Sequence, residues 1–236
     1  MLDLEEIPNG GFSNDEREGR IAVEKISDDW KNTIDNIIAL CKENGIELIL
    51  YSMPGSDFYL NERGNYDEYY AFCRDFARER GFTYYDFNLA KSEILSLEDS
   101  DYHDDNHLSK KGVYKWTETF CDFFVSKYKE ENALETYFYA SYAEKMAEMS
   151  DKIFGLYMIT GDDKKTMKIT PLTNARDTKR ITYDVYAITA AEEMLLAKDS
   201  INTTVALPSG KSGKIRVVSY LDGIKQNDCV ESFASF

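Results

Sequence analysis

The sequence predicts an α/β half followed by a small antiparallel β domain, with a boundary near residue 150. Two observations support this prediction. Up to about residue 128, amphipathic helical patterns alternate with short apolar runs, which is typical of helices that cover a parallel sheet. From about residue 150 onward, strand-like runs follow one another and are separated by turn residues, as in antiparallel sheets. We therefore expect two domains, residues 1–149 and 150–236.

The first predicted elements are a helix and a buried strand. Residues 1–26 contain the turn formers Pro8-Asn9-Gly10-Gly11 and are expected to be irregular. Ser27 is a good helix N-cap, and Gly45 is a natural C-terminal stop. The apolar run Ile46–Tyr51 then predicts a strand, closed by Pro54-Gly55. Between the cap and the stop, apolar residues recur at helical spacing: Trp30, Ile34, Ile37, Ile38 and Cys41.

The same succession then repeats. Asn65 is expected to cap a second helix that ends at Gly81, and the run Phe82–Phe87 predicts a second strand. A polar stretch over 96–106 leads to Ser109, which is expected to cap a helix over 113–128. One more helix is predicted over 133–148, before the sequence pattern changes to consecutive strands.

Strand patterns dominate the remaining residues. Ile215, Val217 and Leu221 alternate with Arg216 and Tyr220, as in a strand with one buried face. Gly-Asp-Asp, Pro-Ser-Gly and Asp-Gly segments supply the turns. The expected strands cover 152–160, 180–189, 203–207 and 214–221.

Composition excludes several kinds of partner. The formal net charge is −15, and residues 1–129 hold 15 Lys and Arg against 27 Asp and Glu. Such acidity argues against binding to nucleic acid or to an anionic membrane surface. No apolar run reaches membrane-spanning length, and residues 1–6 lack the features of a signal peptide. We expect a soluble cytoplasmic chain, or a cell-envelope or extracellular one if a further segment precedes it.

The four cysteines are scattered along the sequence. None of them forms a Cys-x-x-Cys pair, and three fall on apolar faces of predicted helices, where a free cysteine usually behaves as a small core residue. We therefore expect neither a zinc cluster nor a disulfide framework. The four residues are Cys41, Cys73, Cys121 and Cys229.

Both histidines of the chain lie in one short loop, at His103 and His107. Histidine is the side chain best suited to proton transfer near neutral pH. The order Asp104-x-x-His107 lets a carboxylate hold the Nδ1 proton of an imidazole while Nε2 acts as a base. Ligands of parallel α/β sheets gather beyond the carboxyl ends of the strands, where this loop and the loop at Ser56 are both expected.

The segment from Trp30 to Phe124 resembles the C-terminal half of SGNH/GDSL-type hydrolases. The resemblance depends on a strand that ends at Ser52-Met-Pro54, a strand that leads to Asp86-Phe-Asn88, and the block Asp104-Asp-Asn-His107-Leu108 with Gly112 before a helix. It implies part of a doubly wound, flavodoxin-like parallel sheet. It also implies esterase or acyltransferase chemistry on an O-acylated carbohydrate, without cofactor or metal. In that chemistry Asp104 would orient the general base, His107.

The sequence departs from the family in two respects. No Gly-Asp-Ser block supplies the nucleophilic serine, and no Gly-x-Asn block supplies an oxyanion-hole asparagine. Few residues precede Trp30, so the chain resembles a family member without its N-terminal half and is expected to be inactive alone. Ser56 matches a loop that shapes the substrate pocket in the family. Ser56 is therefore expected to contact substrate, with a nucleophilic role as the weaker alternative.

Several other interpretations stay open from the sequence. Asp104 can simply cap its loop while His107 binds backbone. A metal site is conceivable because His103, Asp105 and their neighbours offer imidazole and carboxylate ligands, although we expect none. The non-enzymatic alternative is an inactive scaffold whose β domain binds carbohydrate or protein. An incomplete parallel sheet would also expose a strand edge, so a homo-oligomer is a further expectation.

Overall fold

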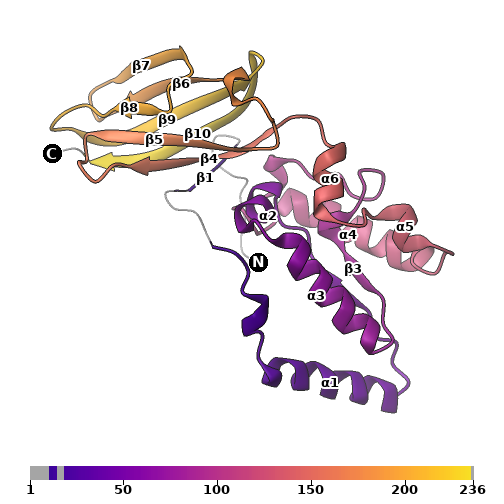
Figure 1. The fold of residues 1–236 in the computed structure, drawn as a ribbon. Coiled ribbons are helices and arrows are strands. Elements are labelled where there is room, and N and C mark those ends of the chain that lie inside the picture. The colour runs from indigo at the N-terminus through magenta and orange to yellow at the C-terminus, as the bar shows by residue number, and fades with distance from the viewer. Residues whose placement is uncertain (1–10, 15–18, 235–236) are drawn as a thin grey trace.

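The computed structural model describes residues 11–14 and 19–234. It consists of a β-sandwich at one end of the molecule and a helical layer around a short parallel sheet (Figure 1). The fold is thus mixed α/β, with one mixed and one antiparallel sheet in the sandwich. The helices are α1 Asp28–Glu43, α2 Asp57–Arg63, α3 Tyr66–Glu79, α4 Lys110–Asp122, α5 Ala133–Tyr137 and α6 Tyr142–Glu148. The strands are β1 Phe12–Asn14, β2 Leu50–Ser52, β3 Tyr84–Asp86, β4 Ile153–Thr160, β5 Thr166–Thr173, β6 Ile181–Ile188, β7 Glu193–Ser200, β8 Thr204–Ala206, β9 Ser212–Leu221 and β10 Ile224–Ala234. Short 3-10 helices cover Val23–Lys25, Phe87–Leu89, Asp99–Asp101 and Thr178–Arg180, and a π-helix covers Phe123–Lys127.

The sandwich consists of two four-stranded sheets. Their strand orders are β1-β4-β5-β8 and β10-β9-β6-β7. All pairs are antiparallel except β1 with β4, where Phe12 lies opposite Gly155 in a parallel pair. Alternate side chains of both sheets fill an aliphatic core between them, as expected for two packed sheets. This core includes Ile153, Leu156, Met158, Ile169, Val185, Ile215 and Val217.

Strand β1 corrects the expectation that residues 1–26 are irregular. Phe12–Asn14 joins the sandwich although it lies far from β4 in the sequence, and the Cys229 thiol donates a hydrogen bond to the Phe12 carbonyl oxygen (3.3 Å). Three residues carry too little pattern to reveal a strand whose partner is so distant in the chain. The turn formers Pro8 to Gly10 lie outside the described residues.

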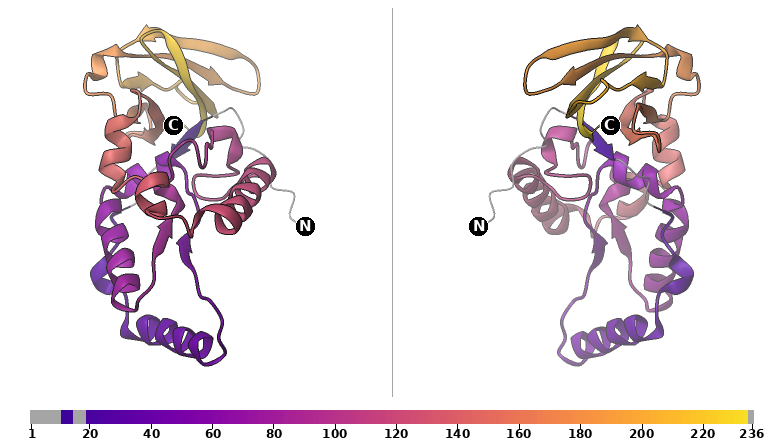
Figure 2. Two further views of the ribbon diagram at one scale, coloured as in Figure 1. Left: turned by 90° about the vertical axis from the view of Figure 1, so that its right-hand side faces the viewer. Right: turned by 90° about the vertical axis from the view of Figure 1, so that its left-hand side faces the viewer.

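The parallel sheet is small. Strands β2 and β3 pair in parallel, with Tyr51 opposite Tyr85, and they make up the whole parallel sheet among the described residues. Aromatic side chains pack around them: the Phe87 ring meets the Trp116 ring of α4 edge-on, with 4.6 Å between centroids. Helix α1 lies away from this core, at the end of the molecule opposite the sandwich (Figure 2).

Strand β4 connects the two halves because both of its faces are buried. Leu156 and Met158 point into the sandwich core, while Phe154 and Tyr157 belong to the aromatic core of the helical half. Gly155 lets Phe58 of α2 approach closely, since an added Cβ would lie 2.4 Å from the Phe58 ring. The helical half therefore packs on the sheet that contains β1 and β4.

Other elements differ from the sequence-based expectations at their ends. The single helix expected over 133–148 is divided into α5 and α6, because Phe138 forms a β-bridge with Ala90 and Ser141 caps a new helix. The strands expected over 46–51 and 82–87 are shorter, and β5, β7 and β10 had not been expected. The four strands expected after residue 150 correspond to β4, β6, β8 and β9.

Within the part of the chain that the structure describes, no helix combines the length and the apolar character needed to cross a membrane.

Candidate functional site

The loop that carries both histidines is closed by its own backbone. Tyr102 and Leu108 form an antiparallel bridge, and the His103 N–H donates to the His107 carbonyl oxygen at 2.8 Å. The Ser109 hydroxyl accepts the Gly112 N–H and so caps α4, as the sequence predicts. Gly112 is needed here because an added Cβ would lie 1.9 Å from the Asp101 carbonyl oxygen. The loop is therefore clamped against the start of α4.

Asp104 and His107 form the expected side-chain pair. The Nδ1 atom of His107 lies 3.0 and 2.9 Å from the two carboxylate oxygens of Asp104. The same carboxylate accepts the backbone N–H groups of Asn106 (3.0 Å) and His107 (2.7 Å). Three donors thus hold Asp104 in place, and Nε2 of His107 makes no hydrogen bond to any residue that the structure describes. The imidazole is oriented for proton transfer at Nε2.

The electrostatics of the pair favour an ionised carboxylate. Partial burial acts to raise the pKa of Asp104, but the hydrogen bonds from Asn106 and from the His107 ring and N–H outweigh it. The pKa of Asp104 therefore lies below its ordinary value. A carboxylate that stays charged stabilises the imidazolium that forms when His107 takes a proton.

His107 lines a cavity of about 600 Å³ at the carboxyl end of β2. The part of the lining that we call the floor consists of Ser52, the last residue of β2, of the residues Met53 to Gly55 that follow it, and of Asn88, which follows β3. Helices α2 and α3 contribute the walls, and Arg20 also lines the cavity. The wall residues are Ile21, Ala22, Tyr59, Leu60, Arg63, Tyr66, Tyr69 and Asn106. This is the position that parallel sheets give to their ligands.

A buried polar network fixes the floor of this cavity. The Tyr66 hydroxyl donates to Asp86 (2.7 Å), and the Asn88 amide donates to the Tyr66 oxygen (2.7 Å) and to the Met53 carbonyl (3.2 Å). The Asn88 side-chain oxygen accepts the Gly55 N–H at 2.7 Å. Burial raises the pKa of Asp86. The network ties the ends of β2 and β3 together and holds the loop after β2 in one conformation.

Ser56 has a different environment from the one expected. Its side chain is buried, and its hydroxyl donates a hydrogen bond to the Asp105 carbonyl oxygen (2.5 Å). The Ser56 hydroxyl oxygen also accepts the Tyr59 N–H (3.1 Å), so Ser56 is the N-cap of α2. Its backbone N–H also donates to Asp105. Ser56 is not among the residues that line the cavity. The structure thus places Ser56 as a link between the two loops that form the site.

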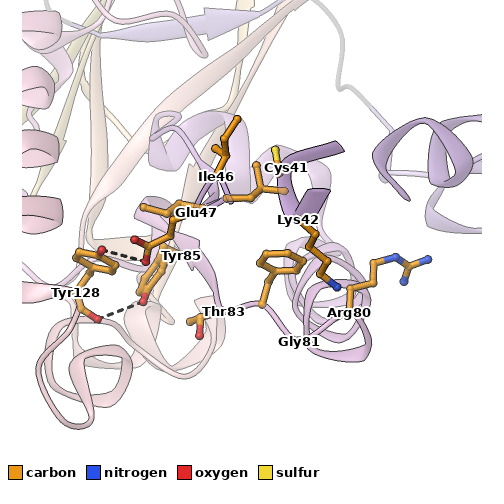
Figure 3. Close-up of a pocket in the computed structure, with 12 residues that line it drawn as sticks. Cys41, Lys42, Ile46, Glu47, Arg80, Gly81, Thr83, Tyr85 and Tyr128 are labelled. Atoms are coloured by element: carbon orange, nitrogen blue, oxygen red, sulfur yellow. Dashed lines mark hydrogen bonds between the residues drawn. The ribbon is translucent and has the colours of Figure 1, made fainter. Parts of the chain in front are cut away.

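A second cavity, of about 470 Å³, lies at the opposite end of the parallel pair (Figure 3). It is bordered by the end of α1 and by the residues that precede β2 and β3. Figure 3 shows the Tyr85 hydroxyl donating to the Tyr128 carbonyl and the Tyr128 hydroxyl donating to Glu47. Since it adjoins the amino ends of the strands and has no imidazole in its lining, we assign the site to the His107 cavity instead.

Sequence reasoning missed most of the cavity wall. The spacing of Asp104 and His107 in the sequence was sufficient to predict the pair. Arg63 and Tyr69, in contrast, lie on helices whose sequence pattern is that of ordinary amphipathic helices. The signal that was available is Asp86-Phe-Asn88, because polar residues at the end of a buried strand point to a site. Among the described residues, no group of three or more histidine, cysteine, aspartate or glutamate side chains is arranged to hold a metal ion.

Comparison with known proteins adds no identity to this geometry: no protein-family model, curated protein or solved structure matches the chain.

Proposed function

We propose that this chain carries the acid–base half of an SGNH-type esterase or acyltransferase site that acts on an O-acylated carbohydrate. The observation that carries the proposal is the Asp104–His107 pair at the edge of the cavity beyond β2. The proposal includes the wider, doubly wound sheet of that family, of which β2 and β3 would be two strands. It also assigns no metal and no cofactor to the reaction.

The geometry supports a defined sequence of proton transfers. In the proposed reaction, Nε2 of His107 accepts the proton of an attacking hydroxyl, and the carboxylate of Asp104 stabilises the resulting imidazolium. His107 then gives that proton to the leaving alcohol oxygen of the sugar. The sequence contains no Gly-Asp-Ser block, so the nucleophilic hydroxyl in this proposal comes from a segment outside the sequence or from a bound acceptor.

The cavity wall suits a sugar ester. The aromatic residues Tyr59 and Tyr69 line it, and the Arg63 guanidinium lies over the Tyr59 ring, with 4.4 Å to the centroid. Aromatic faces pack on the C–H surfaces of pyranose rings, and a guanidinium donates to hydroxyl or acyl oxygens. The volume of about 600 Å³ lies within the usual range of small-molecule sites.

Nitrogen NMR of the single imidazole in a His103→Ala variant tests the proposal. We expect His107 to carry its proton on Nδ1, and Asp104→Asn to change that tautomer. Addition of an O-acetylated oligosaccharide should shift the His107 resonances, and its deacetylated counterpart should shift them less. A proton on Nε2, or a His107 resonance that is unaffected by every member of an O-acetylated panel, would contradict the proposal.

The chain alone should not be an efficient esterase. We expect it to hydrolyse p-nitrophenyl acetate no faster than its own His107→Ala variant, because the chain supplies half of the catalytic groups. Ser56→Ala is the matched control, since Ser56 is buried between the loops. Fast hydrolysis that Ser56→Ala abolishes would show that Ser56 is the nucleophile and that our assignment is wrong.

The second candidate is an inactive scaffold whose sandwich binds carbohydrate or protein. The observation that favours it is that Tyr186, Arg216 and Tyr220 lie half-buried on the side of the sheet β10-β9-β6-β7 that faces away from the sandwich core. Carbohydrate binding that survives His107→Ala, together with a His107 that no acylated sugar perturbs, would favour this candidate over the catalytic one.

A further inference from the structure

Three basic side chains of the described part of the chain line the His107 cavity: Arg20, Arg63 and His107 itself. Among the residues that the structure describes, no aspartate or glutamate lines it. This composition contrasts with the whole chain, which has 43 acidic residues and a formal net charge of −15. A cleft whose lining has one sign of charge attracts ligands of the opposite sign. The lining therefore favours an anionic ligand.

Two other cavities of the molecule combine both signs of charge. The cavity of about 470 Å³ in Figure 3 is lined by Glu47 as well as by Lys42. A cavity of about 300 Å³ beside α6 is lined by Asp57 as well as by Lys145, and these two side chains form an ion pair (2.8 Å). A basic lining is thus a property of the cavity that carries the Asp104–His107 pair and not of the molecular surface in general.

Neighbouring carboxylates occupy only one nitrogen of the Arg20 guanidinium. Its Nη2 atom donates to both carboxylate oxygens of Glu68 (2.7 and 2.8 Å) and lies 3.7 Å from a carboxylate oxygen of Glu24. Its Nε and Nη1 atoms make no hydrogen bond to any residue that the structure describes. A guanidinium has five N–H donors in a planar fork, so Arg20 can bind a second oxyanion while it keeps its bond to Glu68.

The Arg63 guanidinium is oriented by an aromatic ring. Arg63 and Tyr59 lie four residues apart on α2, and the guanidinium carbon is 4.4 Å from the centroid of the Tyr59 ring. Stacking of this kind uses the face of the guanidinium, whereas a carboxylate or a phosphate is bound by the N–H groups at its edge. An arginine that is already ordered loses less side-chain entropy when an oxyanion binds.

We propose that the His107 cavity selects a sugar that carries an oxyanion, either a carboxylate or a phosphate, and that Arg20 and Arg63 bind this group. The sugar and its acyl ester rest on the proposed function, but the charge of the lining does not depend on the catalytic pair. In this arrangement the oxyanion fixes the sugar in the cavity, and the acyl ester of the same sugar faces Nε2 of His107.

Three methyl glucosides that differ only at C6 test the proposal. The group at C6 is a carboxylate in methyl glucuronoside, a phosphate in the 6-phosphate and a neutral hydroxymethyl group in methyl glucoside. Titrations observed through the NMR signals of the sugar measure the three affinities for the whole chain. We expect at least one of the anionic sugars to bind about tenfold more tightly than the neutral one. The tighter of the two anionic sugars then identifies the source of the oxyanion.

Variants of the two arginines show whether this preference arises in the cavity. Arg20→Gln/Arg63→Gln should reduce the affinity for the anionic sugar to that for the neutral one, while Arg63→Lys should retain part of the preference because the charge remains and the fork is lost. Arg78→Gln is the matched control, since Arg78 is mostly exposed on α3, pairs with Asp75 (3.1 Å) and does not line the cavity. Thermal unfolding checks that each variant is folded.

The outcomes separate this proposal from the catalytic one. A preference for the anionic sugar that the double arginine variant removes supports the oxyanion site, even if no acylated sugar perturbs His107. Neutral O-acetylated sugars that shift the His107 resonances as strongly as acidic ones would retain the hydrolase assignment and overturn the oxyanion site. Equal affinity for the three glucosides, or a preference that the folded double variant keeps, would overturn it as well.

Discussion

The two halves of this molecule bury their apolar side chains in different ways. The sandwich core is mainly aliphatic, built from residues such as Ile153, Leu156 and Val217, and its sheets are formed from long antiparallel strands. The helical half has an aromatic core around two parallel strands of three residues each. It also holds most of the exposed large apolar side chains: Trp30, Ile37, Leu40, Ile46, Tyr51, Met53, Val113, Tyr114 and Val125.

This difference shows that two halves with a similar content of apolar residues need not enclose their cores equally well. In the sandwich, alternation places a contiguous set of fully buried aliphatic side chains between the two sheets. In the helical half, α1 buries Ile38 and leaves Leu40 60% exposed, and one edge of β2 has no partner strand among the described residues. The sandwich should therefore be the more stable half, and the helical half should depend on its contact with β4.

The largest expected effect comes from the same substitution in the two halves. Leu156→Ala creates a cavity in the sandwich core and should lower the free energy of unfolding by about 3 to 4 kcal/mol. Leu40→Ala on α1 should change it by less than about 0.5 kcal/mol, because that side chain is mostly in solvent. Urea denaturation measures both. Equal losses would contradict the comparison.

The contact between the halves can be broken at Gly155. Gly155→Val would force a Cβ to within 2.6 Å of the Phe12 carbonyl oxygen and against the Phe58 ring, at a cost of about 3 kcal/mol. We expect the helical half to lose its protection from hydrogen exchange before the sandwich does. Gly19→Ala is the control, since no residue that the structure describes lies within 4 Å of an added Cβ there. Simultaneous loss of protection in both halves would show that they unfold as one unit.

Acid should affect the two halves in opposite directions. Arg216 lowers the pKa of Asp228 in the sandwich. The stabilising contribution of the Asp228 carboxylate is therefore complete above pH 3.8, the ordinary pKa of aspartate, and is lost as the pH falls through the lowered pKa. Burial raises the pKa of Asp86 in the helical half, so its ionisation destabilises the fold as the pH rises from 3.8 through the raised pKa.

Substitution by asparagine sharpens this contrast. Asp228→Asn should remove part of the loss of stability below about pH 4, and Asp86→Asn should remove part of the loss that accompanies ionisation above about pH 4. Denaturation midpoints measured from pH 3 to 7 check both slopes. A steeper acid loss in Asp228→Asn, or an unchanged slope in Asp86→Asn, would contradict the assignments.

The smallest expected effect concerns self-association through the exposed side chains of α1 and β2. We expect weak, concentration-dependent dimers, because exposed strand edges and apolar patches promote pairing. Leu40→Lys should weaken the dimer about tenfold, or about 1.4 kcal/mol. Ile201→Lys, at a similarly exposed position in the sandwich, is the matched control. Sedimentation that shows a monomer at all concentrations, or equal effects of both variants, would contradict this expectation.

The sequence predicted those parts of the fold that depend on local pattern. The caps at Ser27 and Ser109 are confirmed, because a cap requires only neighbouring residues. Strands β7 and β10 were missed since charged and polar residues interrupt their alternation, and β5 contains Pro171, which weakens a strand prediction. Strand β1 depends on a partner far along the chain, which no local pattern reveals.

The candidate site likewise contains a part that the sequence predicted and a part that it did not. The spacing of Asp104 and His107 was sufficient to predict their hydrogen bond, because both lie in one turn. The cavity was beyond sequence reasoning, since its walls come from the segment at Arg20, from α2 and from α3. The packing of Ser56 against Asp105 also required the three-dimensional arrangement, because two loops distant in the sequence meet there.

Strand β1 has a consequence for how this architecture can change. Since β1 and β4 are adjacent in one sheet, and Ser13 also donates to Glu231 of β10 (2.9 Å), everything between Asn14 and Ile153 is an excursion that leaves the sandwich and returns to it. The entropy cost of closing such a loop grows only with the logarithm of its length, so doubling the excursion costs about 0.6 kcal/mol. Further strands and helices could thus be inserted beside β2 with little penalty to the pairing of β1 with β4.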